Sequence, residues 1–598
     1  MSDSTNYTVA DFIVERLQEW NVKRIFGYSG DAINPVVCAL NKEDAPIKFV
    51  QGRHEEMCAF MACAHAKFTG EIGVCLATSG PGAIHLLNGL YDAKMDNQPV
   101  LAIVGQQSRK ALGTSFIQDV DLTSLFKDVA HEYVNVATDA AQVRHLIDRS
   151  IITALSKRTV TCLILPHDVQ TASIKTEPER THGQSFSGIC YPDTAVVPPL
   201  SELQKAADII NAAERPAILV GAGSLKAREQ IIALAEKTGA GVAKALLGKA
   251  VIEDSLPYVT GAIGLLGTEA SSQMMQHCDA LLMIGSNFPY AEFLPEPGKA
   301  RGIQIDLEPA NISLRYPMEV GLIGDSVNTL KALLPLLTDK TDPQWREQIK
   351  NWVDASEREL SDRAIAEGKP VNPERVFANL STHLPGDSII TCDSGTSTVW
   401  FARHLKMRPG MMASVSGGLA SMGCSLPYAI AAKFAFPGRP VVACSGDGAM
   451  QMAGINELIT ISKYWREWAD PRLVIVVLKN NDLNFVTWEM RDTEGDPRFA
   501  AAQDLPDFSY AFYATSLGLE GLKIDNPEMV ESTLTQAFAA QKPVLVEVVS
   551  DPNIAPAPPS MSIQKEGNLG MALAKEGLSG ATPIMDSLKM AWHALTQR

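Results

Sequence analysis

The chain has 598 residues, a hydrophobic content of 46%, a charged content of 20% and a formal net charge of −16. This length predicts three or four domains, and the composition is typical of an ordinary soluble globular protein. The acidic balance argues against a nucleic-acid-binding protein, which usually carries a basic face. No apolar run reaches the roughly 18 residues that would indicate a membrane span.

The ten cysteines are scattered along the chain and form no CxxC pair. This distribution favours reduced core cysteines, as in a cytosolic protein, over a metal or disulfide framework. The N-terminal segment MSDSTNYTVADF is polar and acidic, unlike a signal peptide. We therefore expect a cytoplasmic protein.

Short apolar strands alternate with amphipathic helical patterns through three long stretches of the chain, which predicts parallel α/β sheets. Two segments interrupt this alternation: residues 174–199 are polar, and residues 339–373 are highly charged. Both are typical of linkers, the second partly helical. They predict domains at residues 1–175, 196–338 and 372–550, followed by a tail at 551–598 that begins with a Pro-rich stretch.

A glycine-rich turn, Gly446-Asp447-Gly448, ends one apolar strand, and Asn480-Asn481 ends the apolar strand LVIVVLK. Glycines let backbone N–H groups approach a diphosphate closely. A hard divalent cation prefers carboxylate, amide and carbonyl oxygens. Asp447, Asn481 and the carbonyl of Leu483 supply that set, and the pattern resembles the thiamine diphosphate (ThDP) signature.

Three motifs of the N-terminal domain, RHEE at 53–56, SGPG at 79–82 and NGLYDA at 88–93, resemble the pyruvate oxidase and acetolactate synthase group of ThDP enzymes. The resemblance implies that Glu55 hydrogen-bonds the pyrimidine ring of ThDP. A carboxylate there would stabilise the imino tautomer of the cofactor, whose nitrogen removes the proton from thiazolium C2.

Other interpretations of these residues stay open at the level of sequence. Glu55 also fits a solvated carboxylate at a helix start, where the dipole favours negative charge, and Glu56 is the neighbouring competitor. His54 and His85 fit either a pocket role or a structural one.

The segment TSFIQDVDLTSLF resembles the loop that family members use near the substrate. The family pattern is Phe-Gln-Glu, whereas this chain has Ile117-Gln118-Asp119. Gln118 could donate a hydrogen bond to a substrate carboxylate or carbonyl. Ile117 replaces the aromatic ring, which leaves the shape of the substrate pocket open.

In the middle domain an apolar strand leads into Gly221-Ala222-Gly223, a pattern that fits either phosphate binding or a tight packing turn. Asn287 and Phe288 follow another strand, Asp306 ends a third, where it could accept hydrogen bonds from ribose, and Asp325 follows Gly324. Together these features resemble the FAD-binding domain of pyruvate oxidases. Related ThDP decarboxylases have the same domain without flavin.

In the C-terminal domain the resemblance implies that Gly395, Thr396 and Ser397 contact the diphosphate, and that Met422 supports the bent cofactor. Met422 also fits simple core filling. The expected cofactor-binding residues are Gly395, Thr396, Ser397, Met422, Gly446, Gly448, Ala449, Gly221, Gly223, Asn287, Phe288, Asp306 and Asp325.

After Asn481, the positions of Phe485, Val486 and Glu489 match in type the substrate-side residues of pyruvate oxidases. Glu489 could move protons on the reacting group, or it could be an exposed carboxylate at a helix start. The expected catalytic residues are therefore Glu55, Gln118 and Glu489, and the expected substrate pocket comprises Ile117, Phe485, Val486 and His85.

The expected fold class is α/β, with three doubly wound parallel-sheet domains: pyrimidine-binding, central FAD-binding and Rossmann-like, and diphosphate-binding. The resemblance implies oxidative decarboxylation of pyruvate or a similar 2-oxo acid with ThDP, Mg2+ and FAD. The products would be CO2 and acetyl phosphate or acetate, with electrons passing to oxygen or a quinone. The alternatives are an acetolactate synthase-like carboligase with non-redox FAD and a non-catalytic regulatory subunit.

The family arrangement implies a homodimer or homotetramer in which Glu55 and Asp447 of different subunits serve one site. In the tail, Ile584, Leu588, Trp592 and Leu595 recur at helical spacing. Such a stripe could rest on a membrane surface or pack over its own active site. The segment is short and not strongly basic, so packing is the favoured interpretation.

Overall fold

The computed structural model describes residues 7–42, 46–175, 182–183, 185–192, 195–340, 342–559 and 563–576. The chain forms two compact units. The first comprises Met1–Pro192, Val415–Val441 and Ala449–Pro471, and the second comprises Asp193–Ser414, Val442–Gly448 and Arg472–Arg598. The expected stripe of the C-terminal tail lies outside the described residues.

The first unit contains a parallel six-stranded sheet in the order β2-β1-β3-β4-β6-β5. Its strands are β1 (Arg24–Gly27), β2 (Lys48–Gln51), β3 (Gly73–Ala77), β4 (Val100–Gln106), β5 (Val134–Val136) and β6 (Val160–Pro166). Every residue of β3, β4 and β6 is buried. Such burial on both faces is why these strands read as continuous apolar runs.

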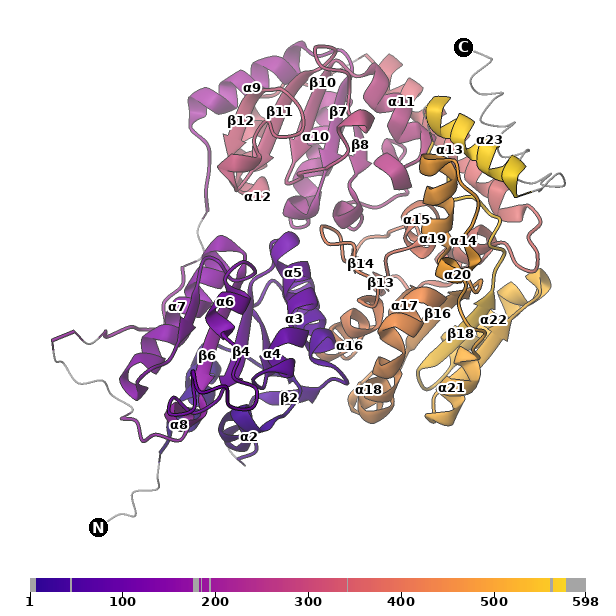
Figure 1. Cartoon of the computed structure of the whole chain (residues 1–598). Helices are drawn as coiled ribbons and strands as arrows, with labels where there is room; N and C mark the ends of the chain where they lie inside the picture. The colour runs from indigo at the N-terminus through magenta and orange to yellow at the C-terminus, as the bar shows by residue number, and fades with distance from the viewer. Residues whose placement is uncertain are drawn as a thin grey trace. The chain divides into compact units, whose positions relative to one another are not determined.

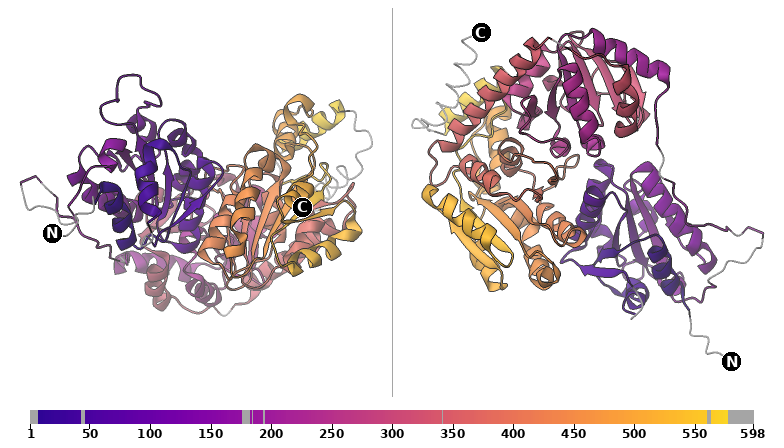
Figure 2. Two further views of the ribbon diagram at one scale, coloured as in Figure 1. Left: turned by 90° about the horizontal axis from the view of Figure 1, so that it is seen from below. Right: turned by 180° about the vertical axis from the view of Figure 1, so that it is seen from behind.

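Helices cover both faces of this sheet. Figure 1 shows α7 beside one face and α3 and α5 beside the other, and the view from behind in Figure 2 agrees. The helices of the first unit are α1 (Val9–Glu19), α2 (Asn34–Leu40), α3 (Glu55–Thr69), α4 (Pro81–His85), α5 (Leu87–Met95), α6 (Leu122–Phe126), α7 (Val143–Lys157), α8 (His167–Gln170), α16 (Ser425–Ala435) and α18 (Glu457–Tyr464). The last two come from the C-terminal third of the sequence, and α16 packs against α3.

The second unit contains two further sheets. The central one has the order β12-β11-β10-β7-β8-β9, with β7 (Pro216–Val220), β8 (Gly241–Lys244), β9 (Val259–Ala262), β10 (Ala280–Ile284), β11 (Arg301–Asp306) and β12 (Met318–Ile323). Its helices are α9 (Leu200–Ala212), α10 (Arg228–Thr238), α11 (Glu269–His277), α12 (Ser326–Leu333) and α13 (Gln344–Ile365).

Helix α13 lies in the charged segment that we expected to be a partly helical linker. It is 22 residues long, and its Trp345 and Ile349 belong to the apolar core around the central sheet. Trp345 also donates a hydrogen bond from its indole Nε1 to the carbonyl of Pro216, at 3.0 Å. The segment therefore contributes to the central core, because its few apolar residues lie on one face of a long polar helix.

The last sheet has the order β14-β13-β15-β16-β18-β17. Its strands are β13 (Ile389–Cys392), β14 (Met412–Val415), β15 (Val441–Gly446), β16 (Leu473–Lys479), β17 (Glu520–Ile524) and β18 (Val544–Val549). The second unit also contains the helices α14 (Pro373–His383), α15 (Thr396–His404), α19 (Asn484–Glu489), α20 (Ala500–Gln503), α21 (Tyr510–Ser516), α22 (Val530–Ala539) and α23 (Ile563–Lys575), while α17 (Asp447–Met452) begins in it.

The α/β fold class with three parallel sheets is confirmed. All ten cysteines are free thiols. Among the described residues, no helix is both long and apolar enough to cross a bilayer.

Candidate functional site

A carboxylate and two imidazoles meet at the start of α3. His85 Nδ1 lies 3.0 Å from Glu55 Oε2, and the rings of His54 and His85 stack with their centroids 4.4 Å apart. His54 is the N-cap of α3 and accepts a hydrogen bond from the backbone N–H of Glu56. Glu55 is buried, so it is not the solvated helix-start carboxylate that the sequence left open.

These three side chains offer ligand atoms within 4.8 Å of one another, a spacing that would also suit a metal ion. The hydrogen bond that Glu55 accepts from His85 uses only one oxygen of the carboxylate. The other oxygen can accept a hydrogen bond from a ring nitrogen of a ligand. Glu55 and His85, which the sequence assigned to different roles, are thus one hydrogen-bonded pair.

Helix α18 holds the turn that leads into Glu55. The backbone N–H of Arg53 donates to Glu457 Oε1 at 2.9 Å, and the backbone N–H of Gln51 donates to the Tyr464 hydroxyl at 3.0 Å. Both acceptors come from residues roughly 400 positions later in the chain. The sequence analysis did not single out Glu457, because nothing in the residues around Glu457 indicates that its carboxylate contacts the backbone of Arg53.

Burial raises the pKa of the Glu457 carboxyl from 4.5 to about 7. A carboxyl with a raised pKa in the folded state costs stability as pH rises from the unfolded pKa to the folded one. The free energy of unfolding of Glu457→Gln, measured relative to wild type, should therefore increase by about 3 kcal/mol when the pH is raised from below 4.5 to above 7. Thermal unfolding of both proteins across this pH window measures the difference.

The matched control is Glu467→Gln, at an exposed position after the same helix. Equal pH profiles for Glu457→Gln and wild type would contradict the expectation.

Gln118 is held beside the SGPG turn in a left-handed backbone conformation, with φ of +61°. Its Oε1 accepts a hydrogen bond from Ser79 Oγ at 2.9 Å, and Gln107 Nε2 donates to the same hydroxyl at 3.1 Å. Gly80 also has positive φ, and a Cβ there would lie 2.8 Å from Gln118 Cβ. The Gln118 hydrogen bond uses the oxygen of the side-chain amide, while Ile117 is 69% exposed.

The segment before α16, which contains Met422, is fastened to α5 within the first unit. Asp96 accepts hydrogen bonds from the backbone N–H groups of Gly417 and Gly418, at 3.0 and 2.6 Å. Asn88 Nδ2 donates both to Glu56 Oε1, at 2.6 Å, and to Ser421 Oγ, at 2.9 Å. Asn88 therefore links Glu56 to the Met422 segment, whereas Glu55 contacts His85.

The two glycine-rich turns of the last sheet follow β13 and β15. The chain runs from β13 to β14 on one side and to β15 on the other, so the carboxyl ends of β13 and β15 form a topological switch point, where α/β sheets bind ligands. Gly395 after β13 has φ of +131° and caps α15. A Cβ at Gly395 or Gly446 would meet no atom within 4 Å, which leaves room for a phosphate group beside Thr396 and Ser397.

Asp447 anchors the turn after β15. Its Oδ1 accepts from the N–H of Gly448 at 2.9 Å, and its Oδ2 accepts from the N–H groups of Asn480 and Asn481 at 2.8 and 2.7 Å. Burial raises the pKa of Asp447 to about 6, although these three N–H groups oppose the shift. A divalent cation would stabilise the charged carboxylate further.

The side-chain oxygen of Asn481 lies at the same edge as the Asp447 carboxylate. Asn481 Oδ1 is buried without a hydrogen-bond partner in the described structure, and Asn481 has a left-handed backbone with φ of +54°. Buried polar atoms are normally paired, so an unpaired acceptor beside a buried carboxylate fits a metal ligand. Leu483 follows in the same turn as the N-cap of α19, and Ala449 lies in the first turn of α17.

Helix α19 places Phe485 partly buried and Val486 and Glu489 exposed. Partial desolvation by neighbouring groups, followed by the Asp492 charge, raises the pKa of Glu489. Helix α23 packs on the following segment, Met490–Glu494. Arg491 Nε and Nη2 each lie 3.0 Å from an oxygen of Glu576, and the bidentate pair holds the C-terminal helix against the segment that carries these residues.

The expected flavin-binding residues lie at the carboxyl ends of β7, β10, β11 and β12, and the central sheet has its own switch point between β7 and β10. Gly221 and Gly223 are packed against Gly285: a Cβ at Gly221 would lie 2.4 Å from the Gly285 carbonyl oxygen. The two glycines thus serve the tight packing that the sequence left open.

Polar groups gather beside this turn. Arg315 Nε donates to Asn287 Oδ1 at 3.1 Å, and Asp306 is partly buried at the end of β11, where burial raises its pKa. Phe288 is buried against Gly264 and Tyr290, and Asp325 caps α12 by accepting from the N–H of Asn328. Arg315 is an additional cation that the sequence reasoning missed, because no motif surrounds it.

Comparisons with known proteins identify the family of the chain. Family models of thiamine pyrophosphate enzymes match residues 7–125 (N-terminal TPP binding domain), 203–333 (central domain) and 393–548 (C-terminal TPP binding domain).

Three relatives match the chain nearly end to end. The "Putative thiamine pyrophosphate-containing protein YdaP" of Bacillus subtilis is 34% identical, with 98% of this chain and 99% of that protein covered. A pyruvate oxidase of Lactiplantibacillus plantarum is 29% identical (91% and 89% covered). The acetolactate synthase isozyme 2 large subunit of Escherichia coli is 31% identical (91% and 95% covered). The chain belongs to the thiamine pyrophosphate enzyme family, in the group that includes pyruvate oxidases and acetolactate synthases, and it has two ThDP-binding domains.

Proposed function

We propose that the chain is an oxidase that uses ThDP, Mg2+ and FAD to decarboxylate pyruvate or a similar 2-oxo acid. It would release CO2 with acetyl phosphate or acetate, and pass electrons through FAD to oxygen or a quinone. The observation that carries the proposal is the buried Glu55 carboxylate, which is paired with His85 and has one oxygen available to a ligand.

Residues at two turns of the last sheet would hold the metal ion and the diphosphate. Asp447 and Asn481, with the carbonyl of Leu483, would hold the metal, because they offer oxygen ligands at one turn. Gly395, Thr396, Ser397, Gly446, Gly448 and Ala449 would surround the diphosphate. Bound ThDP supplies an electron sink for the loss of CO2.

The substrate-side residues orient the reacting acid. Glu55 would accept a hydrogen bond from the pyrimidine ring and hold its reactive tautomer, while Gln118 would donate its amide N–H to the substrate carboxylate. Met422 would pack against the cofactor and support its bent conformation. Glu489, with its raised pKa, would give and take a proton at the oxygen of the reacting carbonyl, beside Phe485 and Val486.

The flavin assignment rests on the central sheet. Asn287, Arg315 and Asp306 line the carboxyl ends of β10 and β11 and offer amide, cation and carboxylate groups to a dinucleotide. FAD would supply the two-electron oxidation that separates an oxidase from a decarboxylase. Because the Gly221 turn is tightly packed against Gly285, the turn after β10 and Arg315 would bind the pyrophosphate of FAD instead.

Acetolactate synthase-like carboligation is the second candidate, because a synthase subunit matches the chain as well as the oxidase does. The products decide between the two. Supplied with pyruvate in air, the oxidase releases one acetate or acetyl phosphate per CO2, whereas a synthase releases one acetolactate per CO2 and no acetate. Absence of CO2 release from protein loaded with ThDP, Mg2+ and FAD would indicate a non-catalytic subunit.

We also propose that each active site combines Glu55 of one subunit with Asp447 of another, in a homodimer or homotetramer. Mixing inactive Glu55→Gln and Asp447→Asn chains under exchange conditions should then restore about a quarter of wild-type activity, since half the dimers are mixed and each has one intact site. Differently tagged chains report the exchange. Full exchange with no recovered activity would place both residues in sites within one subunit.

A further inference from the structure

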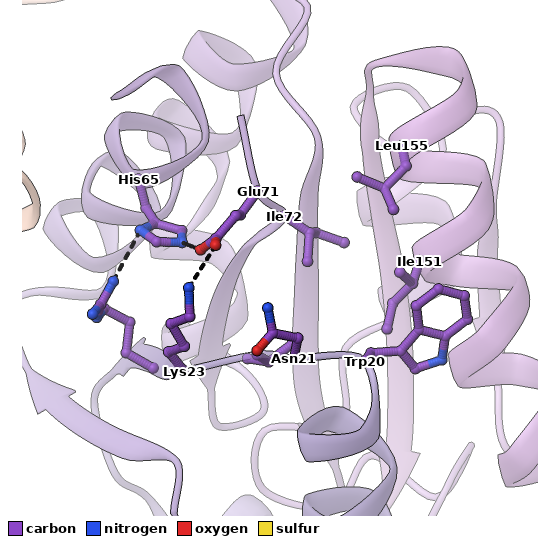
Figure 3. Close-up of a pocket in the computed structure, with 10 residues that line it drawn as sticks. Trp20, Asn21, Lys23, His65, Glu71, Ile72, Ile151 and Leu155 are labelled. Carbon is purple, nitrogen blue, oxygen red and sulfur yellow. Dashed lines mark hydrogen bonds and ion pairs between the residues drawn. The ribbon is translucent and has the colours of Figure 1, made fainter. Parts of the chain in front are cut away.

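A cavity of about 140 Å3 opens at the amino ends of β1 and β3, at the opposite edge of the first sheet from the β2–α3 turn that carries Glu55. Figure 3 shows the polar side chains His65, Glu71 and Lys23 on one side of it, and Ile72, Ile151, Leu155 and Trp20 on the other. The complete lining is Trp20, Asn21, Val22, Lys23, Arg24, His65, Glu71, Ile72, Ile151 and Leu155.

The polar wall is a fixed chain of hydrogen bonds. Arg24 Nη1 lies 3.3 Å from His65 Nδ1, His65 Nε2 lies 3.4 Å from Glu71 Oε2, and Lys23 Nζ lies 2.6 Å from Glu71 Oε1. A guanidinium can only donate, so His65 Nδ1 is the acceptor and the proton sits on Nε2, facing Glu71. His65 is therefore a neutral imidazole here, in accord with the burial that lowers its pKa.

This tautomer sets the charge of the wall. Lys23 and Glu71 compensate each other, His65 is neutral, and Arg24 leaves a net charge of about +1. Arg24 is partly buried, and burial lowers its pKa. Among the described residues its guanidinium has one hydrogen-bond partner, His65, although a guanidinium carries five N–H donors. The remaining donors have the charge and geometry to bind a carboxylate.

The opposite wall is apolar and rigid. Ile151 and Ile72 are buried, and Leu155 is half-buried. Trp20 is held in place because its indole Nε1 donates to Asp148 Oδ1 at 2.8 Å. A cavity of about 150 Å3 lined by apolar side chains is large enough to hold benzene, so the space here suits one small ring or a branched aliphatic group.

We propose that this cavity is a binding site for a small monocarboxylate with an aromatic or branched apolar body, separate from the ThDP site. The carboxylate would pair with Arg24, and the apolar body would lie against Ile72, Ile151, Leu155 and Trp20. The carboxyl ends of α1 and α3 point toward this region and favour cations. Lys23 and Arg24 supply that positive charge, and Arg24 is the one with donors left for a ligand.

Isothermal titration of the full-length protein, loaded with ThDP and Mg2+, tests the proposal with benzoate as the probe. Benzamide, a neutral ligand of the same shape, and benzylammonium, a cation, are the comparison ligands. We expect one benzoate per chain, bound at least about tenfold more tightly than benzamide, since a charge-assisted pair is lost in the amide. Benzylammonium should not bind.

Two variants locate the site. Arg24→Gln should weaken benzoate at least about tenfold by removing the charge, and Leu155→Trp should abolish binding by filling the cavity. Arg215→Gln, at an exposed arginine of the central domain, should bind as wild type. Leu155→Trp also separates this cavity from the substrate site, because turnover of pyruvate should be unchanged.

Equal affinities for benzoate and benzamide, or benzoate binding that survives Leu155→Trp, would overturn the proposal. If Arg24→Gln does not fold, the ligand series on the wild type and the Leu155→Trp variant still decide the result.

Discussion

Glu55→Gln is expected to lower kcat by about 10²- to 10⁴-fold while leaving ThDP bound, because general acid–base groups contribute rate enhancements of that size. The amide keeps the volume of the carboxylate and can still contact His85, which lies 3.0 Å away. Unlike the carboxylate of Glu55, the amide cannot accept a proton and become a neutral acid. Steady-state turnover of a 2-oxo acid, with bound ThDP determined on the same preparation, measures both parts of the expectation.

Glu56→Gln is the matched control, since it changes the same chemical group one residue further along α3. Glu56 accepts a hydrogen bond from Asn88, which an amide oxygen can also accept, so we expect a loss of less than about tenfold. A large loss in Glu56→Gln together with near-normal turnover in Glu55→Gln would exchange their assigned roles.

The second large effect is expected for Asp447→Asn. Three backbone N–H groups converge on the Asp447 carboxylate, and an amide must turn its NH2 group toward at least one of them. The variant also loses the charge that a divalent cation requires. We expect the affinity for Mg2+ and for ThDP to fall by about 100-fold or more, since hydrogen bonds to charged groups contribute about 1.5–3 kcal/mol each.

Titration of Mg2+ and ThDP by calorimetry or by quenching of protein fluorescence measures the loss at Asp447. Asp525→Asn, at a surface carboxylate paired with Lys523 at 3.1 Å, controls for the change of net charge. Wild-type affinity for both ligands in Asp447→Asn would remove this residue from the metal set.

Much of the fold could be predicted because parallel strands buried on both faces read as apolar runs between glycine turns. The strand before Gly446 and the strand before Asn480 were recognisable in this way. Their turns lie near each other because the carboxyl ends of parallel strands share one edge of a sheet. The local sequence therefore predicts a metal set at this edge, which stays a prediction, and the unpaired Asn481 oxygen is compatible with it.

Contacts between distant parts of the chain were not predictable from spacing. The hydrogen bond from Arg53 to Glu457 spans 404 residues, and no periodic pattern encodes it. The charged segment that forms α13 looked like a linker, since one face of few apolar residues is easily missed among many charges. The Gly221 turn illustrates the reverse problem, because tight packing and phosphate binding require the same glycines.

The most direct test of the proposed reaction is anaerobic stopped-flow spectroscopy of the protein loaded with ThDP, Mg2+ and FAD, mixed with pyruvate. We expect loss of the oxidised flavin absorbance at a rate no slower than turnover, with one CO2 released per flavin reduced. We also expect that Glu55→Gln, with both cofactors bound, keeps its flavin oxidised. Steady formation of acetolactate with the flavin spectrum unchanged would show that the protein is not an oxidase.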